Sequence, residues 1–88
     1  MPDADDFKRE LYAVFYEAFK ADKAAIQLSA GDLHRRVGGY PGADHRMPVC
    51  CGVMRDAMDV DAGDLIVNSP PSGDGATLVV RYVLPRRQ

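Results

Sequence analysis

The stretch LIVNSPPSGDGATLVVRYVL, residues 65–84, decides the fold class of this 88-residue chain. It opens with three β-forming residues, passes through the turn-forming cluster 68–75 and continues into a segment in which apolar residues recur at every second position. One face of that segment would carry Leu78, Val80, Tyr82 and Leu84, and the other Thr77, Val79, Arg81 and Val83. The stretch predicts a C-terminal hairpin with a long loop, after which Arg86, Arg87 and Gln88 are expected to fray.

A helical period marks the other end of the chain. Apolar residues recur there at spacings of three and four: Phe7, Leu11, Val14, Phe15, Ala18 and Phe19. Asp5 and Asp6 can cap this segment and favour its dipole, so we expect a helix from about Asp5 to Asp22. Tyr12 and Tyr16 widen the apolar face beyond what a one-sided surface helix needs. Core burial is the simpler expectation for this pair, and an interface with a partner is the alternative.

A second helix is expected after a very short strand around Ile26 and Leu28. Residues 29–32, Ser-Ala-Gly-Asp, form a variant of the capping box with Asp in its last position, which predicts the start of that helix. Leu33 and Val37, four residues apart, would face inward. The segment 38–42, Gly-Gly-Tyr-Pro-Gly, would end the helix, because glycine supports a left-handed cap and proline cannot continue the ladder.

The third helix is expected to begin between Asp44 and Pro48, with Asp44 as its cap. Its inward side would carry Val49, Cys50, Val53, Met54, Ala57 and Met58. Its outward side, where we expect function to lie, would carry His45, Pro48, Cys51, Gly52, Arg55 and Asp59. Three helices with a C-terminal β-hairpin define an α+β class.

Length and composition predict a single domain over residues 1–88, with an ordered core at about residues 5–85. Hydrophobic residues make up 47% of the chain and charged residues 27%, which is typical of a folded protein too short for a second core. No apolar run is long enough to span a membrane, and the N-terminus is acidic where a signal peptide would be basic. Cys50 and Cys51 are adjacent and cannot close a stabilising disulfide loop, so we expect a cytoplasmic protein without a membrane partner.

The order of helix, short strand, helix, turn, helix and long-loop hairpin resembles that of a winged helix-turn-helix domain, over about residues 5–85. The resemblance implies that the third helix enters the major groove of DNA and that the hairpin wing touches the DNA backbone or minor groove. The matching positions are His45, Arg46 and Arg55 on the helix, Asn68, Ser72 and Arg81 on the wing, and Arg35 and Arg36 as additional phosphate contacts.

Charge keeps a second function open. The formal net charge is −2, and the wing loop carries Asp74 but no Lys or Arg, both unfavourable for binding a polyanion. Between Leu33 and Met54, however, three arginines stand against one aspartate. Winged helices also serve as protein-binding modules, so a protein-interaction module or a homodimer, joined through Tyr12 and Tyr16, is the alternative. Neither function is enzymatic, and DNA binding is slightly favoured.

Metal binding and catalysis are disfavoured by spacing. His34, His45, Cys50 and Cys51 are residue types that bind zinc, but adjacent cysteines on a helix project about 100° apart and cannot form the usual ligand pair. Cys51 beside His45 has the chemistry of a nucleophile and base, yet no Asp or Asn is clearly placed to orient the imidazole. We therefore expect no metal and no cofactor, with Cys50 in the core and Cys51 near the surface.

Overall fold

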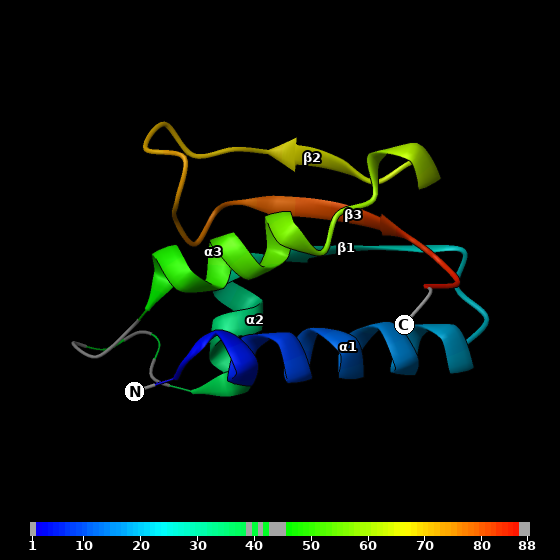
Figure 1. Cartoon of the computed structure of the whole chain (residues 1–88), viewed down its shortest axis with the longest axis horizontal. Helices are drawn as coiled ribbons and strands as arrows, with labels where there is room; N and C mark the ends of the chain where they lie inside the picture. Colours follow the sequence, from blue (N-terminus) through cyan, green and yellow to red (C-terminus); the bar gives the residue numbers. More distant parts are fainter. Residues whose placement is uncertain (1, 39, 41, 43–45, 87–88) are drawn as a thin grey trace.

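The computed structural model describes residues 2–38, 40, 42 and 46–86, and Figure 1 shows the order of its elements. The helices are α1 (Ala4–Lys20), α2 (Ala30–Val37) and α3 (Met47–Asp56), followed by a short 3-10 helix, η1 (Val60–Ala62). The strands are β1 (Ala25–Ser29), β2 (Leu65–Asn68) and β3 (Val79–Val83). The predicted α+β class is confirmed.

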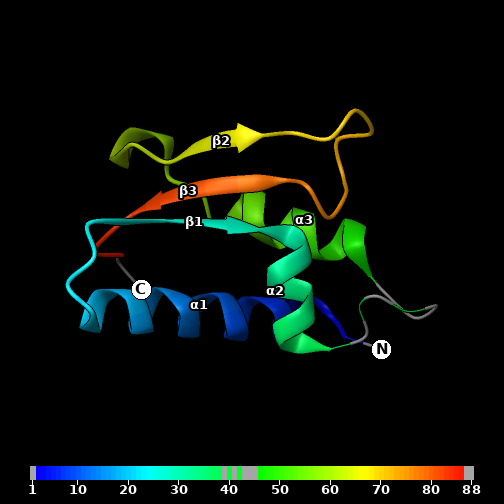
Figure 2. The same cartoon turned by 180° about the vertical axis from the view of Figure 1, so that it is seen from behind.

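The three strands form one antiparallel sheet in the order β1-β3-β2, so the last strand lies between the other two (Figure 2). Ile26 of β1 stands opposite Tyr82 of β3. β2 pairs with β3 over fewer residues, and its register shifts between Ile66 and Asn68. β2 and β3 are consecutive antiparallel strands joined by a long loop, as the sequence predicts, but the shift in register means that they do not form a clean hairpin.

β3 also begins three residues later than predicted, because residues 76–78 bind the first turn of α2 instead of β2. The backbone N–H of Ala30 donates to the carbonyl of Leu78 at 2.8 Å, and that of Gly31 donates to the carbonyl of Ala76 at 3.0 Å. The first amides of a helix have no partner within the helix, and these carbonyls satisfy two of them. A Cβ at Gly31 would lie only 3.2 Å from the carbonyl oxygen of Ala76, a tight contact that glycine avoids.

α1 begins earlier than predicted because its N-cap is Asp3. The side chain of Asp3 accepts the N–H of Asp6, and the carboxylate of Asp6 accepts the N–H of Asp3, each at 3.0 Å. This reciprocal capping box replaces the predicted caps at Asp5 and Asp6. The helix ends at Lys20, because Asp22 adopts the left-handed region with φ of 60°. Of the helices in the described residues, neither α1 nor any other is both long and apolar enough to cross a bilayer.

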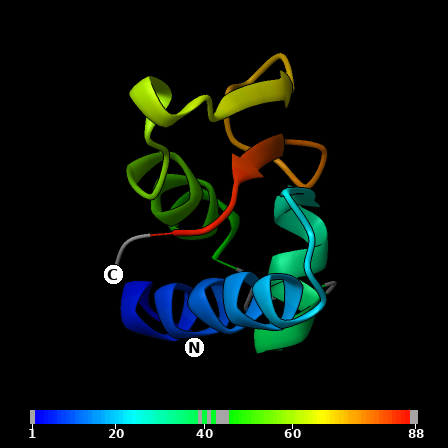
Figure 3. The same ribbon diagram turned by 90° about the vertical axis from the view of Figure 1, so that its right-hand side faces the viewer.

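A hydrophobic core lies between the helices and the sheet. Figure 3, an end view, shows α1 below the strands, with α3 on one side and α2 on the other. α1 contributes Phe7, Leu11, Phe15 and Ala18 to this core. The alternation predicted for the last strand is confirmed, since Leu78, Val80, Tyr82 and Leu84 are all buried. The phenol of Tyr82 donates to the carbonyl of Met54 at 2.8 Å, so the one polar group on that face is satisfied and joins β3 to α3.

Candidate functional site

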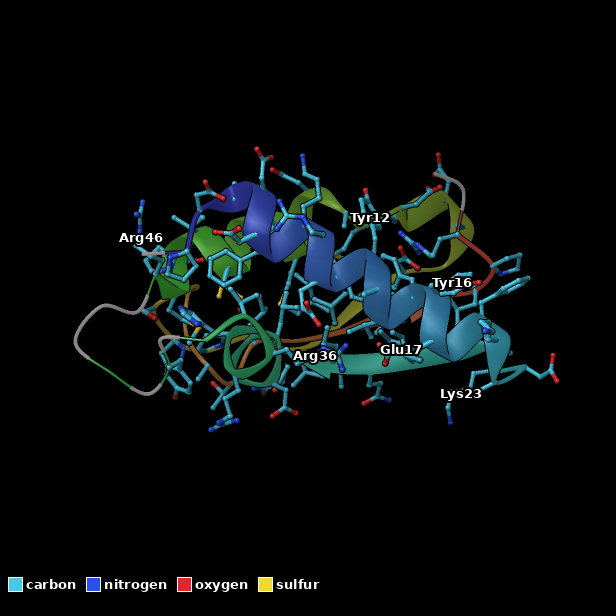
Figure 4. All side chains as sticks on the ribbon, turned by 90° about the horizontal axis from the view of Figure 1, so that it is seen from below. Tyr12, Tyr16, Glu17, Lys23, Arg36 and Arg46 are labelled. Atoms are coloured by element: carbon cyan, nitrogen blue, oxygen red, sulfur yellow. The ribbon has the colours of Figure 1, made fainter. Side chains whose placement is uncertain are left out.

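The arginines predicted on α2 are engaged within the chain. Arg36 reaches α1, where its guanidinium lies 2.9 Å from Glu10 and 3.0 Å from Glu17. Figure 4 shows Arg36 and Glu17 on the same side of α1. Arg35 pairs with Asp32 at 2.9 Å within the first turns of α2. Arg36 therefore ties α2 to α1 and points away from the outward side of α3.

His34 joins α2 to the start of α3. Its side chain is fully buried, and its Nε2 accepts the backbone N–H of Arg46 at 2.8 Å. Because Nε2 accepts, the neutral ring carries its proton on Nδ1. The ring meets Phe7 edge-on at 4.8 Å between centroids and lies 5.6 Å from Tyr40. Arg46 is the N-cap residue of α3; the predicted cap Asp44 and the predicted contact His45 lie outside the described residues.

The loop after β2 lies over the outward side of α3. Arg55 donates to Asp74 at 2.5 Å and also to the carbonyl of Gly73. One turn earlier in α3, the thiol of Cys51 donates to the carbonyl of Gly75, with Sγ 3.5 Å from the oxygen. The prediction that Cys51 lies near the surface is wrong, since its side chain is fully buried. The loop after β2 covers this side of α3, whereas the helical period alone predicts that it faces solvent.

Both cysteines behave as packing residues. The thiol of Cys50 donates to the carbonyl of Ala30 at 3.5 Å. Burial raises the pKa of Cys50 to about 12, and burial also raises the pKa of Cys51. A nucleophile or metal ligand must be a thiolate, which these pKa values oppose. In the part of the chain that the structure describes, no three His, Cys, Asp or Glu residues gather as a metal site.

The predicted wing residues make contacts within the wing. The side-chain amide of Asn68 donates to the carbonyl of Thr77 at 2.8 Å, and the hydroxyl of Ser72 donates to the carbonyl of Asp74 at 2.9 Å. Arg81 stands in the middle of β3, where it alternates with the buried residues of that strand. The described residues predicted for DNA contact thus fall on separate parts of the surface: the junction of α1 and α2, the outward side of α3, and the wing with the outer face of the sheet.

An apolar groove lies along one side of α1, with a volume of about 320 Å³. We call it the aromatic groove, and its lining residues are Tyr12, Phe15, Tyr16, Phe19, Pro85 and Arg86. Tyr12 is 37% exposed, Tyr16 63% and Phe19 53%, so the core burial expected for these three residues is wrong.

Arg86 fixes the floor of the aromatic groove. Its guanidinium donates to the buried carboxylate of Asp64 and to the carbonyl of Ala57, each at 2.5 Å. It also lies over two rings, 4.9 Å from the centroid of Phe15 and 5.2 Å from that of Tyr82. The expectation that Arg86 frays is therefore wrong, while Arg87 and Gln88 lie outside the described residues. No spacing rule marks Asp64 and Arg86 as partners, because they lie 22 residues apart.

The fold and these contacts define a class: a small α+β domain with an aromatic groove on its first helix and with structural, protonated cysteines. Comparison of the chain with protein-family models, with curated protein sequences and with solved structures finds no match. The residues of the chain itself therefore carry the functional argument.

Proposed function

We propose that this chain is a non-catalytic protein-interaction module that docks a partner in the aromatic groove. One observation carries the proposal: three aromatic side chains of a single helix, Tyr12, Tyr16 and Phe19, are exposed around one groove. Aromatic residues are enriched in protein interfaces, where they supply large apolar areas at low conformational cost. Contiguous exposed apolar surface of this kind marks interaction sites in folded proteins.

Burial of these exposed aromatic side chains would supply enough free energy for a partner to bind. Tyr16 and Phe19 are three residues apart and thus lie on neighbouring positions of one helix side, where a single partner surface would cover both. Full burial of one such side chain stabilises a complex by about 1.5–3 kcal/mol relative to exposure. Because several hydrogen bonds already hold Arg86, docking would not have to order the side chain that forms the groove floor.

The cysteines support the non-catalytic part of the proposal. Both Cys50 and Cys51 are free, buried and shifted toward the protonated thiol, which is the opposite of an activated nucleophile. Reduced adjacent cysteines also suit a reducing compartment, and we place the chain in the cytoplasm on that ground.

Selection of peptides from a random library displayed on phage tests the proposal. We expect enriched peptides to carry apolar anchors and to shift the NMR signals of Tyr12, Tyr16 and Phe19. Tyr16→Ser and Phe19→Ser should abolish this binding. Val67→Ser is the matched control, because it alters an apolar residue of similar exposure, 46%, on β2. Enriched peptides that contact another surface, or that bind Tyr16→Ser as well as the original chain, would show that the groove does not dock partners.

DNA binding is the second candidate function, and the order of elements favours it. The chain runs helix, strand, helix, helix, strand, strand, which is the order on which the winged-helix resemblance rests. In that resemblance Arg46 and Arg55 of α3 would meet the major groove. Asp74 opposes this role, because its carboxylate binds the guanidinium of Arg55 and would compete with DNA for it.

Titration of fluorescent duplexes at low and physiological salt tests the second function. Phosphate contacts release counterions, so the affinity should fall as salt rises, and Arg46→Ala and Arg55→Ala should weaken binding. Asp74→Ala should strengthen binding, because it frees Arg55 and removes a negative charge. Undetectable binding at low salt, or an affinity indifferent to salt, would exclude DNA as the ligand.

A further inference from the structure

We infer that the occupant of the aromatic groove is a second copy of this chain, in a homodimer whose twofold axis runs parallel to α1. The inference rests on the proposed function, since it names the partner that docks in the groove. It is drawn from the distribution of charge around the groove and from one exposed apolar residue on the border opposite α1.

The border formed by α1 is basic. Lys20 lies beside the groove, with its Nζ 5.4 Å from the ring centroid of Tyr16. Lys8 lines a second hollow that adjoins the groove at Tyr12. The acidic residues Glu10 and Glu17 of the same helix are turned to the side where Arg36 binds them. Lys8 and Lys20 therefore flank the exposed aromatic residues of α1, whereas the exposed Asp5, seven residues before Tyr12, is confined to the first turn of the helix.

The opposite border, formed by the end of α3 and by η1, is acidic. A third hollow, lined by Asp59 and Ala62, shares Pro85 and Arg86 with the aromatic groove, so both belong to one face of the molecule. Asp56, Asp59 and Asp61 are exposed along this border. Figure 3 shows the chain after β3 lying between α1 and the segment of α3 and η1 on this face. The face thus has a basic border, an apolar centre and an acidic border.

Twofold symmetry makes such a face complementary to itself in one orientation. When two copies meet face to face, the twofold axis lies in the interface. An axis parallel to α1 places the basic border of each copy against the acidic border of the other, whereas a perpendicular axis places like charges together. Opposite charges across an interface favour association and fix its register. The parallel orientation also places Val60 of η1, which is 72% exposed, over the partner's aromatic groove.

The area of the face suits a stable dimer. An interface of standard size buries about 800 Å² per partner, which is roughly 15% of the 5235 Å² exposed by this chain. The extents of the chain are 36 × 25 × 17 Å, and this face is one of its two broad sides (Figures 1 and 3). Exposed aromatic residues at the centre and charged residues at the rim are the usual anatomy of such an interface.

Sedimentation equilibrium of the whole chain with charge-reversed variants tests the homodimer. We expect the original chain to dimerise with an affinity that falls as salt rises. Lys20→Glu and Asp61→Lys should each raise the dimer dissociation constant about tenfold, because symmetry places each substitution in the interface twice. An equimolar mixture of the two variants should recover the affinity, since each cross-copy contact again joins opposite charges. Far-UV circular dichroism would confirm that each variant folds.

Lys23→Glu is the matched control, because it makes the same charge change on the side of the molecule away from Tyr12 (Figure 4), and it should leave the dissociation constant unchanged. A chain that is monomeric at all concentrations up to about 1 mM would overturn the homodimer but not the groove as a docking site, which the selected peptides test separately. A dimer that is indifferent to Lys20→Glu and Asp61→Lys, or that either variant strengthens, would also overturn it.

Discussion

The guanidinium of Arg86 binds the fully buried carboxylate of Asp64, with Nη1 and Oδ2 2.5 Å apart. The same carboxylate accepts the backbone N–H groups of Asp59 at 2.8 Å and Val83 at 2.7 Å. One ion pair therefore joins the end of β3, the segment before β2 and the floor of the aromatic groove. Removing either charge would leave the other buried without its partner.

Asp64→Asn should lower the free energy of unfolding by about 3 kcal/mol, because it breaks a buried ion pair while keeping the side-chain volume. Urea unfolding at neutral pH would measure the change. Asp22→Asn is the control, since it removes an exposed carboxylate that neither border of the proposed dimer face includes, at a left-handed position that Asn tolerates, and it should cost less than about 0.5 kcal/mol. Equal stabilities of the two variants would contradict the role assigned to the ion pair.

The stability of the chain should fall in acid more steeply than that of Asp64→Asn. Desolvation raises the pKa of Asp64, but the N–H groups of Asp59 and Val83 and the Arg86 guanidinium outweigh it and hold that pKa below its usual value of 3.8. A lowered pKa contributes stability that is present above the unfolded-state value and lost as the pH falls through the folded value. Plots of the free energy of unfolding against pH for the two chains should therefore converge below about pH 4. Parallel curves over that range would contradict the assignment.

Cys51→Ser should destabilise the fold as Cys50→Ser does, by about 1–3 kcal/mol each, because it buries a hydroxyl that is more polar than the thiol it replaces. Both side chains are fully buried and both bind backbone carbonyls. A maleimide reagent should accordingly label neither cysteine in the native chain at neutral pH and should label both in urea. Rapid labelling of native Cys51 would show that the loop does not cover it.

Alkaline pH should also weaken the fold. Burial, followed by the charge of Cys51, raises the pKa of Cys50 to about 12, so the native state holds this proton more tightly than the unfolded chain. The resulting stability is complete below the unfolded-state pKa, about 8.5, and is lost as the pH rises toward 12. Cys50→Ala should flatten this decline in urea unfolding at increasing pH. An unchanged slope would assign the decline to other groups.

Arg55→Ala should release the loop after β2 from α3. The guanidinium of Arg55 binds both Asp74 and the carbonyl of Gly73, and no other described ion pair joins this loop to the helix. Amide hydrogen exchange at Gly73 and Gly75 should quicken about tenfold, because local opening loses roughly 1.4 kcal/mol of protection. Arg9→Ala removes the same charge from an exposed site and should leave these amides unchanged.

Helix periods and strand alternation in the sequence by themselves determine the main elements. The spacing of Phe7, Leu11, Phe15 and Ala18 predicts α1 and its buried side, and both are confirmed. The alternation from Leu78 to Leu84 predicts which side of β3 is buried. These predictions succeed because a residue's direction within one helix or strand depends only on local geometry. His34 also follows the apolar side of α2, four residues after Ala30, so the same helical period accounts for its burial.

Only the tertiary structure decides what covers each element and where the candidate site lies. Nothing near Cys51 in the sequence indicates that Gly75, 24 residues later, would bury it. Phe19 has the spacing of a core residue, yet it is 53% exposed beside the aromatic groove. Arg86 resembles a frayed end, but Asp64 and Ala57 bind it and make it the floor of the aromatic groove. Periodicity specifies direction within an element, whereas exposure depends on distant segments, whose positions follow from the packing of the whole chain.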